Sequence, residues 1–278
     1  MPMLPEIELL DGAMGTELFA KGLRWGELPE RWILERPEDV GEVHAAHASA
    51  GAELVLSCTF NLASPRLAAA GIETSVGAIA QAAVDVARRH APHALLAGSV
   101  GPTGLVTPRN PNVPRVEVER WYAAAAGALS DAGVDLLWVE SQWSLEEATI
   151  ALSAMRTTDL PVVLTLSPPS TELTRPGALG PALRSLVALG ASAVGVNCTM
   201  PDAPLAEALR EVGELGVPLV VRPSAGLPGA LASPEAFAQL LVELRAAGAR
   251  WLGGCCGVSP EHLRRAKVRL DAAGSVRE

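Results

Sequence analysis

Short apolar runs alternate with longer amphipathic segments along most of the chain. Eight runs rich in Val, Leu and Ala predict buried β-strands near residues 7–11, 53–59, 94–100, 135–141, 161–167, 193–199, 218–223 and 250–255. The segments between them carry apolar residues at helical spacing and predict helices near 38–50, 76–90, 116–132, 145–156, 181–189, 203–214, 234–247 and 259–270. Strand and helix therefore alternate in the manner of stacked βα units.

A weak internal repeat marks the joints between these units. A Gly flanked by small or apolar residues precedes five of the predicted strands, at positions 51, 133, 190, 216 and 248. Gly is favoured just past a helix because the chain there adopts a left-handed conformation. At the opposite helix ends, Ser144, Ser233 and Ser259 are suited to cap the N-termini.

Eight such units with no intervening linker predict one domain, residues 1–278, folded as an α/β protein of the (β/α)8 TIM-barrel type. Barrels of this kind occupy about 250 residues as a single domain. An open, doubly wound sheet is the alternative topology.

Composition and charge narrow the range of partners. Hydrophobic residues make up 49% of the chain and supply a large core, whereas the net charge of −9 disfavours nucleic acid and anionic membranes as partners. We find neither a membrane-spanning apolar stretch nor a basic, apolar signal peptide, so a cytoplasmic protein is predicted. Four cysteines, two of them adjacent, do not form a disulfide framework.

Polar residues stand at the ends of the predicted strands. The carboxyl ends of the strands form the mouth of a (β/α)8 barrel, where the chemistry of this fold takes place. The residues at these positions are Asp11, Thr59, Ser99, Glu140, Ser167, Cys198, Arg222, Cys255 and Cys256. Three thiols and two carboxyls are therefore expected around one rim.

The three thiols predict a zinc site. Cys198 ends the sixth predicted strand and Cys255–Cys256 end the eighth, so their sulfurs can meet inside a closed ring. The glycines around the pair allow both thiols to turn inward. Three thiolates favour Zn2+ and leave its fourth position open, as in catalytic sites. The alternative is inert buried cysteine, which is our interpretation of Cys58.

Several segments resemble the homocysteine S-methyltransferase family. These are Asp11-Gly12-Ala13-Met14-Gly15-Thr16, Gly98-Ser99-Val100-Gly101-Pro102, Asp135-Leu136-Leu137-Trp138-Val139-Glu140, Gly195-Val196-Asn197-Cys198, Pro223-Ser224-Ala225-Gly226 and Gly253-Gly254-Cys255-Cys256-Gly257. They occur in the family's order over nearly the whole chain. The family includes enzymes that use betaine or S-methylmethionine and the homocysteine-binding module of cobalamin-dependent methionine synthase.

The resemblance implies a role for each matched residue. It implies a (β/α)8 barrel in which Cys198, Cys255 and Cys256 hold zinc. It further implies that Asp11 and Glu140 hold the ammonium group of homocysteine. The backbone amides of Gly12, Ala13 and Met14 would then receive its carboxylate.

Some positions depart from the family pattern or stay open. The segment after the second strand reads Ser57-Cys58-Thr59-Phe60-Asn61 instead of a Thr-Asn-Thr-Phe-like sequence, and Ser224 replaces the usual Asn. We expect no folate-binding or cobalamin-binding module. Trp143 is suited either to packing, which we favour, or to facing a methylated cation. Arg222 could contact a carboxylate or line the barrel, and the five histidines are predicted to be surface or capping residues.

These features predict a zinc-dependent enzyme that methylates the sulfur of homocysteine to form methionine. A sulfonium donor such as S-methylmethionine is favoured because its leaving group, a neutral thioether, needs no general acid. The alternatives are a homocysteine-activating module that uses a methylcorrinoid or methylfolate partner protein, a zinc hydrolase, and a non-catalytic homocysteine-binding or zinc-storage module.

Overall fold

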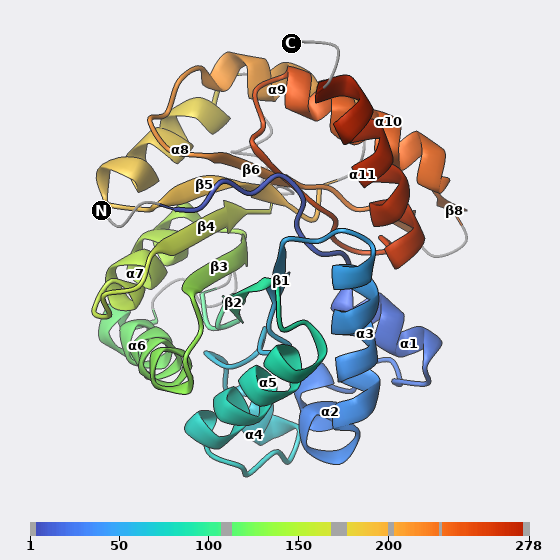
Figure 1. Cartoon of the computed structure of the whole chain (residues 1–278). Helices are drawn as coiled ribbons and strands as arrows, with labels where there is room; N and C mark the ends of the chain where they lie inside the picture. The colour runs from blue at the N-terminus through green and yellow to red at the C-terminus, as the bar shows by residue number, and fades with distance from the viewer. Residues whose placement is uncertain (1–3, 107–112, 168–176, 200–202, 228–229, 275–278) are drawn as a thin grey trace.

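Seven parallel strands form most of a barrel in this computed structural model, which describes residues 4–106, 113–167, 177–199, 203–227 and 230–274. The strands pair in sequence order as β1 (Leu54–Leu56), β2 (Leu95–Val100), β3 (Leu136–Gln142), β4 (Val162–Leu166), β5 (Ala193–Asn197), β6 (Leu219–Arg222) and β9 (Trp251–Leu252). Figure 1 shows the helices arranged around the outside of this sheet.

The N-terminal segment closes the ring. Leu9 pairs in parallel with Leu252 of β9, and Leu10 pairs in parallel with Leu54 of β1. The Leu10 amide donates to the Leu252 carbonyl at 2.7 Å, and the Asp11 amide donates to the Leu54 carbonyl at 3.0 Å. The predicted first strand is therefore the eighth member of the barrel, and the (β/α)8 prediction is confirmed over the open-sheet alternative.

Each predicted helix lies where the apolar spacing placed it. These are α3 (Pro37–Ser49), α5 (Val76–His90), α6 (Arg115–Ala132), α7 (Leu145–Met155), α8 (Leu179–Ala188), α9 (Ala203–Val212), α10 (Pro234–Ala246) and α11 (Pro260–Gly274). Elements that we did not predict are α1 (Met14–Ala20), α2 (Pro29–Glu35), α4 (Arg66–Ala69) and the antiparallel pair β7 (Gly226–Leu227) and β8 (Ala230–Leu231).

Most of the predicted helix ends are present, although α9 ends at Val212, before Gly216. The repeat glycines 51, 133, 190, 216 and 248 all have positive φ. Ser144 and Ser233 accept hydrogen bonds from the amides of Glu147 and Ala236. Ser259 instead pairs with Nδ1 of His262 at 2.8 Å.

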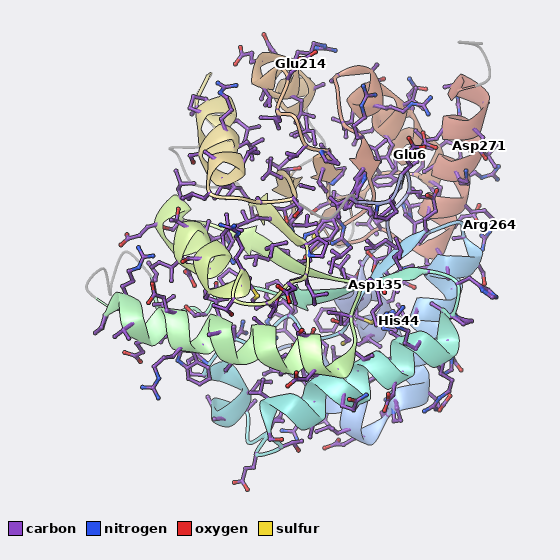
Figure 2. All side chains as sticks on the ribbon, turned by 60° about the vertical axis from the view of Figure 1, so that its left-hand side comes forward. Glu6, His44, Asp135, Glu214, Arg264 and Asp271 are labelled. Carbon is purple, nitrogen blue, oxygen red and sulfur yellow. The ribbon has the colours of Figure 1, made fainter. Side chains whose placement is uncertain are left out.

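The core has an inner and an outer part. The inner part fills the barrel and includes Leu10, Leu54, Trp138 and Trp251, whereas the outer part joins the strands to the surrounding helices. Charged side chains such as Glu214, Arg264 and Asp271 project from the outside (Figure 2). In the part of the chain that the structure describes, no helix is long and apolar enough to cross a membrane.

The prediction for the histidines is wrong at two positions. His44 and His47 of α3 are fully buried, and none of their ring nitrogens has a hydrogen-bond partner. Burial lowers the pKa of His44 to about 4 and that of His47 to about 3, so both rings are neutral at pH 7. Histidine also occurs in cores as a neutral ring, and helical spacing alone does not distinguish that use from surface exposure.

Candidate metal and amino-acid site

The three predicted thiols meet at the mouth of the barrel. Cys198 follows β5, and Cys255 and Cys256 follow β9, with β6 between the two strands. Their Sγ atoms lie within 4.8 Å of one another, and those of Cys198 and Cys256 are 3.7 Å apart. The sequence prediction that these sulfurs share one point is therefore confirmed.

The spacing of the sulfurs fits a tetrahedral metal ion. Zn–S bonds near 2.3 Å at tetrahedral angles place two sulfur ligands about 3.8 Å apart. The three thiols provide three such ligands, and Cys256 is exposed while Cys198 and Cys255 are half-buried. The three thiols therefore supply the sulfur ligands that a soft ion such as Zn2+ prefers.

The three thiols also form hydrogen bonds with one another. Hydrogen bonds from Cys255 and Cys256 lower the pKa of the Cys198 thiol to about 3. Hydrogen bonding to Cys198 raises the pKa of Cys255 and of Cys256. A bound cation would favour the thiolate form of all three cysteines.

Two buried carboxyls lie beside the thiols and are joined by Arg222. Nη2 of Arg222 donates to Oδ1 of Asp11 at 2.6 Å, and its Nη1 lies 3.5 Å from Oε2 of Glu140. Asp11 also accepts the amide of Leu56 at 2.7 Å, and Glu140 accepts the hydroxyl of Ser99. Arg222 therefore contacts both carboxyls, which answers the question that its sequence position left open.

Burial dominates the charge state of the carboxyls. It raises the pKa of Asp11 to about 7, although the Arg222 guanidinium and the Leu56 amide act in the opposite direction. Burial also raises the pKa of Glu140, again against the attraction of Arg222. With both carboxyls ionised, the three charged groups carry one net negative charge, which matches a single ammonium group.

The turn after Asp11 is tightly packed. The Ala13 amide donates to the Val258 carbonyl at 3.0 Å. A Cβ on Gly12 would lie 2.5 Å from the same carbonyl oxygen and 3.1 Å from Nε2 of His47. Gly12 is thus required for close approach of the turn to the chain beyond Cys256, and the Ala13 amide is already used.

Other rim residues support the site without reaching the thiols. Thr59 donates to the Ser99 carbonyl at 2.8 Å and thereby holds the strand that carries the Ser99 hydroxyl. Cys58 is buried, as predicted, and burial raises its pKa well above its usual value. The interpretation of Trp143 as a packing residue is wrong, because Trp143 is 56% exposed.

Two polar residues contact the thiols, and these contacts were not predicted from the sequence. Nδ2 of Asn197 lies 3.9 Å from Sγ of Cys255, and Oγ of Ser224 lies 3.8 Å from Sγ of Cys198. Asn197 directly precedes a predicted ligand, and this position was the signal available. The Ser224 contact depends on where the loop after β6 turns, which strand patterns do not predict.

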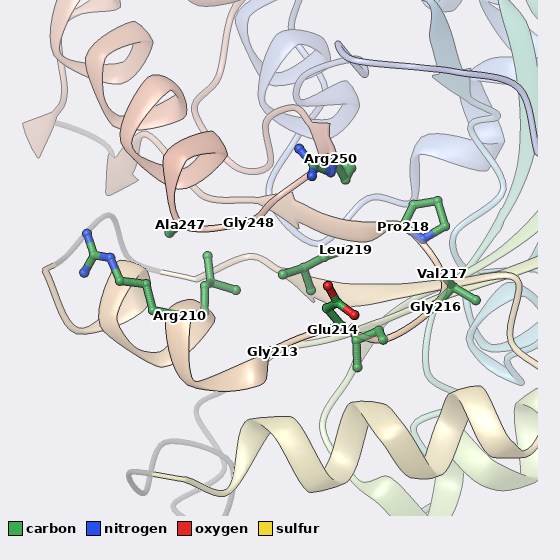
Figure 3. A pocket seen from close by; sticks show the side chains of 12 residues that line it. Arg210, Gly213, Glu214, Gly216, Val217, Pro218, Leu219, Ala247, Gly248 and Arg250 are labelled. Atoms are coloured by element: carbon green, nitrogen blue, oxygen red, sulfur yellow. The ribbon is translucent and has the colours of Figure 1, made fainter.

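A separate groove lies at the opposite end of the barrel. Leu209, Arg210 and Arg250 are among the residues around it, together with the turns that lead into β6 and β9 (Figure 3). These turns precede the strands, whereas the cysteines follow them. The groove is therefore remote from the thiols.

Comparison with known proteins agrees with this geometry. The model of the homocysteine S-methyltransferase family matches residues 8–270. This chain belongs to the homocysteine S-methyltransferase family. The match spans the Asp11 turn, Glu140 and all three clustered cysteines, so the family relation covers the whole site.

Family members of two lengths are similar to the chain. Homocysteine S-methyltransferase of Escherichia coli is 31% identical, with 95% of each sequence covered. Methionine synthase of Mycobacterium tuberculosis is 29% identical over 91% of the chain, which spans only 24% of that longer protein. The crystal structure of the metallated homocysteine methyltransferase MmuM from E. coli superposes with a TM-score of 0.80 at 26% identity, covering 95% of this chain and 96% of that one.

Proposed function

We propose that the protein transfers a methyl group to the sulfur of homocysteine and forms methionine. The observation that carries this proposal is the meeting of three thiols beside a buried acid pair at the mouth of one barrel. The thiols provide a site for a metal and a sulfur, and the carboxyls provide a site for an ammonium group. Homocysteine carries both of the matching groups.

Zinc is the metal that the donor set fits. Cys198, Cys255 and Cys256 would hold it, and the bound ion would favour the thiolate form of the substrate sulfur at neutral pH. The protein's own contribution is position, because a fixed nucleophile facing a methyl group avoids the entropy cost of bringing two solutes together.

The acid pair would orient the amino acid. Asp11 and Glu140 would receive the ammonium group, with Arg222 keeping the two carboxyls in place. The substrate carboxylate would face the turn at Gly12, Ala13 and Met14. Because the Ala13 amide donates to Val258, we expect the amides of Gly12 and Met14 to make this contact.

A sulfonium such as S-methylmethionine is the donor that the site favours. Its thioether leaving group takes no proton, and neither histidine that lies near the site is suited to supply one. His47 is buried with a pKa lowered to about 3, and both ring nitrogens of His262 are engaged, by Ser259 and by the Ala232 carbonyl. A folate donor would require protonation at nitrogen.

Turnover assays test the reaction directly. Purified zinc-loaded protein is incubated with homocysteine and, in separate reactions, S-methylmethionine, S-adenosylmethionine, methyltetrahydrofolate or methylcobalamin, and methionine is quantified by mass spectrometry. We expect methionine with a sulfonium donor. No methionine with any sulfonium would contradict the donor assignment.

A second candidate is a homocysteine-activating module that works with a methyl-carrier protein. The similarity to a quarter of the M. tuberculosis methionine synthase favours this alternative. Homocysteine binding together with turnover only from a corrinoid or folate donor would support it. Hydrolysis of a test ester or amide without methyl transfer would instead support the zinc hydrolase.

A further inference from the structure

The side chain of Asn197 connects the thiol cluster to the strand that carries Glu140. Its Oδ1 accepts the Ser141 amide at 2.8 Å, and its Nδ2 donates to the Ser141 hydroxyl at 2.7 Å. The same Nδ2 lies 3.9 Å from Sγ of Cys255. Asn197 is fully buried, whereas its partners Ser141 and Cys255 are half-buried.

The backbone around this amide is strained in two places. Ser141 and Cys198 are the residues other than Gly with positive φ in the described chain, at 57° and 56°. Ser141 follows Glu140, and Cys198 follows Asn197. Positive φ is unfavourable for such residues and persists where surrounding contacts enforce it.

A bulge accompanies the strain in β3. The pairing of β3 with β4 shifts register between Val139 and Gln142, the interval that contains Glu140 and Ser141. Bulges redirect side chains next to active sites. The two hydrogen bonds between Asn197 and Ser141 hold this bulge against the end of β5, which fixes the backbone position of Glu140 relative to Cys198.

We propose that Asn197 is a positioning residue that sets the distance between the metal ligands and the Glu140 carboxylate. This inference rests on the proposed function, since it takes those two points as the sulfur end and the ammonium end of the substrate. Homocysteine is one methylene longer than cysteine. A fixed span between the two ends would therefore select homocysteine over cysteine.

The amide is suited to this role because it both accepts and donates. An Asp at this position would still accept the Ser141 amide, but it would place a carboxylate instead of an N–H group toward the Cys255 sulfur. An Ala at this position would lose the two hydrogen bonds to Ser141 and the contact with the Cys255 sulfur. Asn197→Asp therefore tests the contact with the metal ligand, which we call the metal half of the role. Asn197→Ala tests this contact together with the second half, the hydrogen bonds to Ser141.

Metal binding tests the first half. Co2+ is added to each protein, and the thiolate-to-cobalt absorption bands and the affinity in competition with a chelator are measured. Loss of a hydrogen bond next to a metal ligand lowers metal affinity by about 10–100-fold, and we expect this loss with shifted bands in both variants. Thr165→Val is the matched control, because it removes another buried hydrogen bond, from Trp138, that lies away from the cysteines.

Binding of homocysteine and cysteine tests the second half. Each thiol is titrated into the Co2+-loaded proteins, and the dissociation constant is taken from the spectral change. The wild type is expected to prefer homocysteine by about 10–200-fold, the range that one methylene supports. Asn197→Ala should reduce that preference to within a few-fold, while Asn197→Asp should keep most of it because the bulge remains held.

The outcomes are distinct. Unchanged bands, metal affinity and thiol preference in both Asn197 variants would overturn the inference, as would the same changes in Thr165→Val. If Asn197→Ala does not fold, the metal half is decided by Asn197→Asp and the thiol preference by Ser141→Ala, which removes the hydroxyl that accepts from Nδ2 of Asn197 and should lower the preference for homocysteine. A wild type that binds Co2+ but neither thiol would overturn the proposed function, whereas the metal measurements would still test the contact with Cys255.

Discussion

The same side chain has different chemistry at Cys58 and at Cys255. Cys58 is buried among apolar groups, and its raised pKa keeps it a neutral thiol. Cys255 lies at the strand mouth, within reach of two further sulfurs. Proximity to other donor atoms, and not burial, therefore distinguishes the proposed metal ligand from the packing residue.

Cys255→Ser should abolish retention of zinc while leaving the barrel folded, because the remaining two sulfurs and a hydroxyl form a much weaker site for a soft ion. Cys58→Ala is the matched control and should retain about one zinc per chain. Metal analysis after dialysis and far-ultraviolet circular dichroism provide the measurements. A full equivalent of zinc in Cys255→Ser would show that the assigned thiol is not a ligand.

Glu140→Gln should raise the KM for homocysteine by about 10–100-fold, the cost of losing a hydrogen bond to a charged group. The reason is that Gln keeps the shape of the side chain but not the charge that attracts the ammonium group. 4-Mercaptobutyrate, which has no amino group, should bind both proteins alike. An equal loss of affinity for the two thiols would mean that Glu140 does not contact the ammonium group.

At this scale, the sequence predicted the residues whose type reveals their chemistry. The thiols and carboxyls follow apolar strands, and a parallel barrel brings all strand ends together. Arg222 was ambiguous because a charge at the end of an apolar strand fits both lining and pairing. The contacts of Asn197 and Ser224 were not predicted because they depend on backbone turns of one or two residues.

At the scale of helices and strands, the sequence predicted the presence of the elements better than their lengths. The strands were predicted because each is buried on both faces and reads as a continuous apolar run. Two strands were predicted much too long: β1 covers Leu54–Leu56 and β9 covers Trp251–Leu252, because the chain leaves the sheet to form the rim. Helices α1, α2 and α4 have four to seven residues, too few to show an apolar period.

Close packing of neighbouring strands makes Gly195 a sensitive position. A Cβ there would lie 1.8 Å from the Val220 carbonyl oxygen, so β5 and β6 could not keep their register. Gly195→Ala should lower the free energy of unfolding by about 3 kcal/mol, at the upper end of overpacking costs. Zinc binding should weaken as well, since Cys198 follows β5.

Gly127→Ala is the control for this change. Nothing lies within 4 Å of the added carbon, and Ala in the middle of α6 should raise the free energy of unfolding by up to about 1 kcal/mol. Urea denaturation of both variants provides the measurement. Equal stability of Gly195→Ala and the wild type would contradict the described packing of the two strands.

For the whole molecule, the buried acid pair links stability to pH. The pKa of Asp11 is raised from 3.8 to about 7, so the folded protein binds this proton more tightly than the unfolded chain does. The contribution of Asp11 to the free energy of unfolding is therefore largest at low pH and falls as pH rises from about 4 to about 7, by about 1.4 kcal/mol per unit.

Asp11→Asn should remove that slope. The two metal-free proteins are unfolded with urea at pH values from 4.5 to 7.5, and the difference in free energy between wild type and variant is plotted. As pH rises, the free energy of unfolding of the wild type should fall steadily relative to that of Asp11→Asn. The difference should level off above pH 7. A difference independent of pH would show that Asp11 keeps an ordinary pKa in the folded barrel.

The barrel as a whole brings three thiols and a buried acid pair to one mouth, and the central claim is that a metal held by the thiols takes the substrate sulfur as its fourth ligand. X-ray absorption at the zinc edge, with and without homocysteine, tests this claim most directly. We predict three sulfur ligands at about 2.3 Å and one lighter ligand in the free enzyme, and four sulfurs once homocysteine is bound. Fewer than three sulfurs at rest, or a shell that homocysteine leaves unchanged, would contradict the account.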